Sequence, residues 1–254
     1  MHYNLYISPC PNDTFMFDAL INGHIDLGGL SFNVEFYDIE ELNKKAIGGE
    51  AHFTKLSCAV LPAIKDRYEV SRSGAALGRG NGPLLVRRKG YTGAINRVAV
   101  PGVHTTAASL MRRLFPEVAH HTPMLFSSIA EAVESGEFDA GVLIHEGRFC
   151  YEQRNLELVA DLGLEWERRL GLPLPLGAIA MRRDVEEPVR RAFEQLLRKS
   201  IEYAFDNPLA SRDFVKQHAQ EMDDSVIEAH IALFVNDYSL DLGSEGESAL
   251  QALQ

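Results

Sequence analysis

Residues 97–107 read RVAVPGVHTTA, and this stretch combines the marks of a strand and of a helix start. Its apolar opening predicts a short buried strand over residues 97–100. Pro101 and Gly102 then turn the chain, and Thr105 is suited to cap a helix. The stretch therefore predicts one βα unit, from which α/β proteins are built.

The same alternation of strand and helix extends over the rest of the chain. The strands that we expect are residues 2–7, 31–37, 97–100, 139–144, 156–160 and 178–181. The helices that we expect begin at or just after Asp38, Lys55, Thr105, Ser128, Asp184, Asn207 and Asp223. Repeated βα units predict an α/β protein with mostly parallel sheets flanked by helices.

The order of these segments predicts two lobes. A second block of strands and helices starts near Lys89, and the sequence PLPLG at 173–177 interrupts the pattern before the last strand. We expect lobe 1 to comprise residues 1–87 and 177–254, and lobe 2 residues 88–176. The chain would then cross between the lobes near residues 87 and 176.

Composition excludes several classes of protein. With 25 basic and 36 acidic residues, the net charge of −11 makes broad binding of a nucleic-acid backbone improbable. We interpret the acid-rich segment after Lys216, the last basic residue, as a soluble surface. No apolar run approaches the roughly 20 residues that span a bilayer, and the N-terminus does not resemble a secretion signal. We therefore expect a cytoplasmic protein with no membrane partner.

Two segments near the ends of expected strands are candidate ligand sites. The first-turn amides beside Thr105, Thr106 and Ala107 would suit a carboxylate or phosphate, although Thr105 can equally be an ordinary helix cap. His145 directly follows the apolar run 139–144, where ligands of α/β sheets gather. There an imidazole can take a proton near neutral pH, or it can simply be a loop residue.

The segment SPCPNDT at residues 8–14 follows the first expected strand. Asn12 and Asp13 can cap the next helix and face the same cleft. A nucleophilic role for Cys10 is disfavoured because no base lies near it in the sequence.

Three further segments have weaker signals. Lys55 and Ser57 could hold a polar substrate, or be a solvated lysine and a helix cap. The glycine-rich segment 78–83 lacks the spacing of a phosphate-binding loop and suits a hinge or a cleft wall. His120 and His121 lack partners at metal-ligand spacing, so we expect no metal site.

Six segments in order resemble the 1,4-dihydroxy-6-naphthoate synthase family of the futalosine route to menaquinone. They are SPCPNDTF at 8–15, TKLS at 54–57, ALGRG with GPL at 76–84, PG with HTTA at 101–107, IHE with RF at 144–149, and GLPLPLG at 171–177. Each segment alone is weak evidence, whereas the ordered set is specific and covers residues 4 to 246.

The resemblance implies a fold, an activity and roles for residues. The fold would be that of type II periplasmic binding proteins, with a ligand cleft between two α/β lobes. The enzyme would be a lyase that releases 1,4-dihydroxy-6-naphthoate from cyclic dehypoxanthine futalosine without metal or redox cofactor. His145 would be the general base. The residues that would contact substrate are Lys55, Leu56, Ser57, Thr105, Thr106 and Ala107.

The expected partner is thus a small molecule with an aryl carboxylate and sugar-derived hydroxyls, and a homodimer is compatible with an enzyme of this size. Two other functions remain open on the same fold. One is a non-catalytic binding protein for small molecules, because fold alone does not give function. The other is dehydration of chorismate by a related enzyme.

Overall fold

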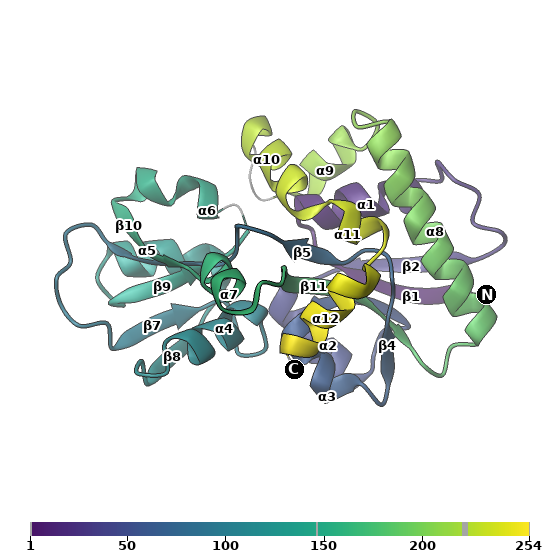
Figure 1. Ribbon diagram of the computed structural model, residues 1–254. Coiled ribbons are helices and arrows are strands. Elements are labelled where there is room, and N and C mark those ends of the chain that lie inside the picture. The colour runs from purple at the N-terminus through teal and green to yellow at the C-terminus, as the bar shows by residue number, and fades with distance from the viewer. Residues whose placement is uncertain (1, 146, 220–222, 254) are drawn as a thin grey trace.

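Two sheets organise the chain, and each forms the centre of one lobe (Figure 1). The computed structural model describes residues 2–145, 147–219 and 223–253. The first and last described elements, β1 (His2–Ile7) and α12 (Gly243–Leu253), lie in lobe 1, and the strands β6 to β10 between them form the sheet of lobe 2.

Lobe 1 contains a six-stranded sheet with the order β2-β1-β3-β11-β4, and β5 pairs with β11. Its strands are β1 (His2–Ile7), β2 (Ser31–Phe36), β3 (Phe53–Ser57), β4 (Tyr68–Val70), β5 (Ala76–Gly78) and β11 (Leu174–Arg182). Its helices are α1 (Pro11–Ile21), α2 (Ile39–Gly48), η1 (Cys58–Val60), α3 (Leu61–Ile64), α8 (Glu187–Asp206), α9 (Arg212–His218), α10 (Asp224–Phe234), α11 (Asp237–Leu240) and α12 (Gly243–Leu253).

Lobe 2 contains a five-stranded sheet with the order β10-β6-β9-β7-β8. Its strands are β6 (Leu84–Arg88), β7 (Arg97–Val100), β8 (His120–Pro123), β9 (Ala140–Leu143) and β10 (Leu156–Asp161). Its helices are α4 (Thr106–Leu114), η2 (Phe126–Ser128), α5 (Ile129–Glu134), α6 (Gly147–Cys150), η3 (Tyr151–Arg154) and α7 (Leu162–Leu170).

Apolar side chains fix the sheet of lobe 1 between two layers of helices. Phe53 of β3 stacks on Phe193 of α8, with 3.9 Å between the ring centroids. On the opposite face, Leu56 belongs to a buried cluster with Ala180 of β11 and Leu250 of α12. Because successive side chains of a strand point to opposite faces, β3 serves both layers.

The sheets are mixed, and the prediction of mostly parallel sheets is wrong in this respect. β1 pairs in parallel with β2 and β3, but β11 is antiparallel to β3, β4 and β5. In lobe 2, β7 is parallel to β8 and β9, whereas β6 is antiparallel to β9 and β10. The antiparallel strands β6 and β11 are those by which the chain enters lobe 2 and returns to lobe 1. A returning strand is not a βα repeat, so repeat counting does not reveal its direction.

The chain crosses between the sheets slightly earlier than expected. Since β6 already belongs to the sheet of lobe 2, the boundary predicted at residue 87 falls inside a strand. The return boundary predicted at residue 176 falls inside β11, which includes Pro175. The register of β11 against β5 shifts between Pro175 and Gly177, so the strand accommodates the proline at an irregularity.

The helix expected over residues 55–64 is wrong in its first part, because residues 53–57 form strand β3. All five residues of β3 are buried, and a strand buried on both faces lacks the alternation that identifies strands. The helix expected at Asn207 begins only at Arg212. The helices capped by Asp38, Thr105 and Asp223 are confirmed.

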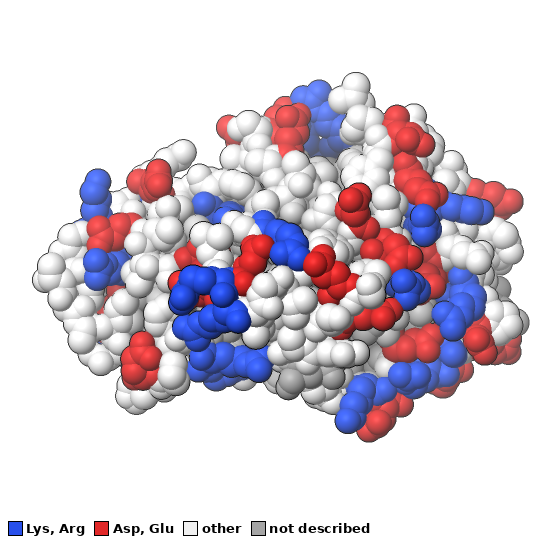
Figure 2. Space-filling model, viewed as in Figure 1, with Lys and Arg blue, Asp and Glu red and all other residues white. Residues whose placement is uncertain are grey.

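Charged side chains of both signs are intermixed on the face of lobe 1 that Figure 2 shows. Arg72, for example, pairs with Asp241 and with Glu247 at 2.7 Å each. In the described part of the chain, no helix has the length and apolar character needed to cross a bilayer.

Candidate active site

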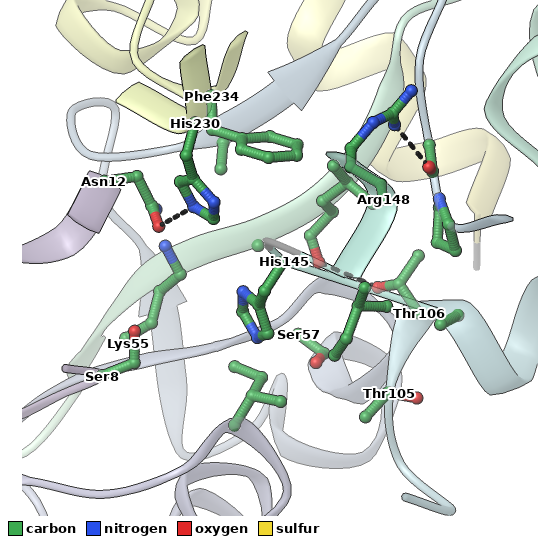
Figure 3. A pocket seen from close by; sticks show the side chains of 18 residues that line it. Ser8, Asn12, Lys55, Ser57, Thr105, Thr106, His145, Arg148, His230 and Phe234 are labelled. Atoms are coloured by element: carbon green, nitrogen blue, oxygen red, sulfur yellow. Dashed lines mark hydrogen bonds between the residues drawn. The ribbon is translucent and has the colours of Figure 1, made fainter. Parts of the chain in front are cut away.

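A cavity with about 700 Å³ of empty space, part of it open to solvent, lies where the two lobes meet. Figure 3 shows its side chains approaching from both lobes. Lobe 1 contributes Ser8, Asn12, Ile39, Lys55, Ser57, Ala76, Leu176, Gly177, His230 and Phe234, and the segment from the crossing through lobe 2 contributes Gly82, Pro83, Thr105, Thr106, Ala107, Ile144, His145 and Arg148.

His145 follows β9 and carries its ring into this cavity. Its φ is 54°, a left-handed conformation that residues other than glycine rarely adopt and that often marks functional sites. The ring contacts Phe126 edge-on at 4.8 Å between centroids, and Cys10 Sγ lies 3.4 Å from His145 Nδ1. Burial lowers the pKa of His145 to about 4, with Lys55 acting in the same direction and Asp13 and Asp38 opposing it. The imidazole is therefore neutral at pH 7 and can accept a proton.

A buried ion pair joins β3 to the start of α1. Lys55 Nζ lies 2.6 Å from Asp13 Oδ1, and both side chains are almost entirely inaccessible to solvent. The other oxygen of Asp13 accepts a hydrogen bond from the hydroxyl of Ser8 at 2.7 Å. Asp13 is thus beneath the cavity wall rather than part of it, and it holds Lys55 and Ser8, which do line the cavity.

The alternation of β3 decides which predicted residues reach the cavity. Lys55 and Ser57 share one face of the strand and line the cavity, whereas Leu56 points into the apolar core. Gly177 on the neighbouring β11 leaves room for the lysine, because a Cβ there would lie 2.7 Å from Lys55 Cε. Asn43 fixes Ser57 through two hydrogen bonds. Asn43 Oδ1 accepts from the backbone amide of Ser57 at 2.8 Å, and Asn43 Nδ2 donates to the Ser57 hydroxyl at 3.0 Å.

The start of α4 lines the cavity, and its interpretation as a helix cap is confirmed. Thr105 caps the helix, since its hydroxyl accepts a hydrogen bond from the amide of Ala108 at 3.1 Å. The hydroxyl of Thr106 donates to the carbonyl of Leu176 at 2.9 Å and accepts from the amide of Ala59, so it links the lobes. Thr105, Thr106 and Ala107 all line the cavity, and helix starts in such positions bind anions in other proteins.

Two cavity residues on lobe 1, His230 and Phe234, were not identified from the sequence, because their segment was interpreted as an acidic surface. His230 and Phe234 lie on α10, and His230 is only 1% exposed. With Ile227 they form the buried stripe of α10, at positions i, i+3 and i+7. That spacing, with a histidine inside an apolar stripe, is the signal that could have identified them.

Arg148 is the second basic side chain of the cavity. One guanidinium nitrogen donates to the carbonyl of Gly82 at 2.6 Å, and another lies 3.3 Å from Asp161 Oδ2. Arg148 belongs to the segment 144–149 that resembles the family, but the resemblance implies no role for it. Glu146, which follows His145 in the IHE segment, lies outside the described residues.

The cluster of cavity residues can hold an anionic ligand and move a proton. Within the described ranges, no three His, Cys, Asp or Glu side chains are grouped as metal ligands would be. Lys55, Ser57, Asn12, Thr105, Thr106, Ala107 and His145 are brought together, whereas Leu56 and Asp13 lie behind the wall.

Comparison with known proteins identifies the family. The profile of a menaquinone-biosynthesis family matches residues 3–254. The chain belongs to this family. Among curated relatives, 1,4-dihydroxy-6-naphthoate synthase of Thermus thermophilus is 46% identical over 98% of this chain and 91% of its own length. The enzyme of the same name from Streptomyces coelicolor is 43% identical over 97% and 89%. Family membership makes this chain an enzyme of menaquinone biosynthesis.

Solved structures confirm the two-lobed fold. Protein AF1704 of Archaeoglobus fulgidus superposes with a TM-score of 0.94 at 33% identity, covering 99% of this chain and 95% of that protein. A Candida albicans protein with the generic periplasmic binding protein fold gives a TM-score of 0.74 at 10% identity, covering 100% and 90%. The predicted periplasmic-binding-protein-like architecture is therefore confirmed.

Proposed function

We propose that this enzyme is a lyase that converts cyclic dehypoxanthine futalosine to 1,4-dihydroxy-6-naphthoate, with His145 as the general base. The observation that carries the proposal is a neutral, strained imidazole at the end of β9, inside the cavity between the lobes. The reaction opens a ring by elimination and a retro-aldol-type step. It requires removal of a proton beside a carbonyl, and a positioned histidine accelerates such a step by roughly 100- to 10,000-fold.

Burial lowers the pKa of His145 to about 4, so the imidazole is unprotonated at neutral pH, as a general base must be before it acts. The same shift weakens the imidazole as a proton acceptor, so the step needs a substrate proton that the neighbouring carbonyl makes acidic. The ion-paired side chain of Lys55, fixed by Asp13, also lines the cavity and would stabilise negative charge that develops on the substrate.

The cavity chemistry fits the two ends of the substrate. The amides that start α4, together with Arg148, suit the aryl carboxylate. Ser57 and Asn12 supply neutral hydrogen-bonding groups for the sugar-derived hydroxyls. Movement of the lobes would exclude water during the reaction.

Turnover assays with the purified protein test this proposal. We expect 1,4-dihydroxy-6-naphthoate, identified by mass and absorbance, when cyclic dehypoxanthine futalosine is supplied with chelator and without added cofactor. Chorismate, supplied in parallel, should remain unchanged. Consumption of chorismate instead would favour the related dehydratase. Tight binding of the futalosine compound without any product would favour a binding protein.

A further inference from the structure

The mechanism above does not use His230, the second histidine of the cavity. The residue lies on α10 and lines the cavity on the lobe 1 side. Figure 3 shows its ring on the opposite side of His145 from Thr105 and Thr106. Its ring nitrogens can therefore form hydrogen bonds with protein groups or with a molecule in the cavity.

Hydrogen bonds beneath the cavity fix the tautomer of His230. Asn12 Nδ2 donates to the carboxylate of Asp13 at 2.9 Å, which leaves Asn12 Oδ1 to face His230 Nε2 at 3.1 Å. An amide oxygen only accepts hydrogen bonds, so Nε2 must carry the hydrogen. Burial, His145, Lys55 and Arg148 all lower the pKa of His230 well below 6.5. In the neutral ring, Nδ1 is therefore an unprotonated acceptor.

This acceptor lacks a hydrogen-bond donor in the described part of the protein. His230 Nδ1 is buried and has no hydrogen-bond partner among the described residues. Buried polar atoms without a partner are rare in folded proteins because each forfeits its hydration. The ring borders the cavity, so a molecule bound there can supply the missing donor.

We propose that His230 is a further substrate-binding residue, whose Nδ1 accepts a hydrogen bond from a hydroxyl group of the molecule in the cavity. This inference rests on the proposed function for the identity of that molecule. A neutral lone pair repels a carboxylate and attracts a hydroxyl, so His230 selects the sugar-derived end of the substrate. The carboxylate would then lie toward the start of α4, on the far side of His145 (Figure 3). His230 and α4 together would orient the substrate across the base.

Two substitutions separate this role from a merely structural one. Glutamine places its amide at the distance of Nε2 from the main chain, so His230→Gln can keep the bond to Asn12 while removing the acceptor at Nδ1. Asparagine places its amide at the distance of Nδ1, so His230→Asn keeps an acceptor and loses the bond to Asn12. We expect KM to rise about 10- to 100-fold in His230→Gln, the effect of one hydrogen bond to a buried partner, with kcat less affected. His230→Asn should recover part of that loss. Normal kinetics in His230→Gln with impaired His230→Asn would overturn the proposal, because His230 would then only position Asn12.

Nitrogen NMR on histidine-labelled protein provides a readout that needs neither turnover nor substitution of His230. Without ligand, Nδ1 of His230 should resonate as an unprotonated ring nitrogen and Nε2 as a protonated one. Addition of cyclic dehypoxanthine futalosine to a His145→Gln protein, which should hold the substrate intact, should shift the Nδ1 resonance. A protonated Nδ1, or no shift at saturating substrate, would overturn the inference even if the wild-type protein turned the substrate over. A shift in His145→Gln, together with no turnover by the wild-type protein, would support the inference and contradict the proposed function.

Discussion

The imidazole rings of His145 and His230 lie nearly parallel, with 6.0 Å between their centroids and 14° between their planes. The two residues come from different lobes, one after β9 and the other on α10. Two protonated rings at this distance would repel each other, and burial disfavours each charge further. Both rings are therefore held neutral, which suits a proton acceptor and a hydrogen-bond acceptor facing one cavity.

The stability of the protein should decrease as the pH falls below about 6.5, the ordinary histidine pKa. The pKa of His230 is lowered in the folded state, so below about pH 6.5 the unfolded chain binds a proton at this residue that the folded chain does not bind. The free energy of unfolding then falls by up to about 1.4 kcal/mol for each pH unit below that value. The stability that comes from keeping His230 neutral is therefore fully present only above the unfolded-state pKa. Urea unfolding at about pH 7 and about pH 5 should give a smaller decrease for His230→Gln than for the wild type. Equal decreases would contradict the buried, neutral state of His230.

Removing one member of the Lys55–Asp13 pair should be more harmful than removing both. Asp13→Asn leaves the Lys55 ammonium buried without its counter-charge, which should lower the free energy of unfolding by about 3–5 kcal/mol. The double variant Asp13→Asn with Lys55→Met buries no charge and should be more stable than Asp13→Asn alone. Urea unfolding of the single and double variants measures the difference. Additive effects would show that the two charges are not coupled.

A methyl group at Gly177 should displace the side chain of Lys55 in the cavity. Its Cβ would lie 2.7 Å from Lys55 Cε, so the lysine would have to leave its place beside Asp13. We expect Gly177→Ala to lower turnover at least about tenfold and stability by about 1–3 kcal/mol, as overpacking does. Gly48→Ala is the control, because a Cβ there meets only Glu50, at an ordinary 3.5 Å. Wild-type activity in Gly177→Ala would argue against the need for the observed lysine position.

Cys10 tests whether the site uses a nucleophile instead of a base. The structure removes the objection drawn from the sequence, because Cys10 Sγ lies 3.4 Å from His145 Nδ1. The proposed mechanism needs no covalent intermediate, so Cys10→Ala should keep turnover within about tenfold of the wild type, less than the loss of a general base. The steady-state rate of naphthoate formation provides the measurement. A loss as large as that of a His145 variant would indicate nucleophilic catalysis by the thiol.

The βα units and much of the cavity follow from local sequence patterns. The strand and turn at residues 97–107 and the apolar run before His145 both have the expected structure. These elements are predictable because their periodicity and capping residues act within a few positions of each other. The position of His145 at the end of a strand follows for the same reason.

Other features depend on contacts that no local pattern records. The strand that contains Lys55 is buried on both faces, so its sequence lacks the alternation of apolar and polar residues that would distinguish it from a short helix. Its alternation, once known, separates Leu56 from the two cavity residues beside it. His230 joins Asn12 only through the packing of α10 on α1, and an acid-rich surrounding sequence conceals it. The directions of β6 and β11 likewise reflect the path between lobes rather than any repeat.

The most direct test of the central claim compares wild-type protein with His145→Gln on cyclic dehypoxanthine futalosine. The variant should fold and bind the substrate, but its rate of 1,4-dihydroxy-6-naphthoate formation should be at least about 100-fold lower, because it lacks the proposed general base. Calorimetry with the variant verifies binding, and circular dichroism verifies the fold. Turnover by His145→Gln near the wild-type rate would contradict the assignment of His145 as the base.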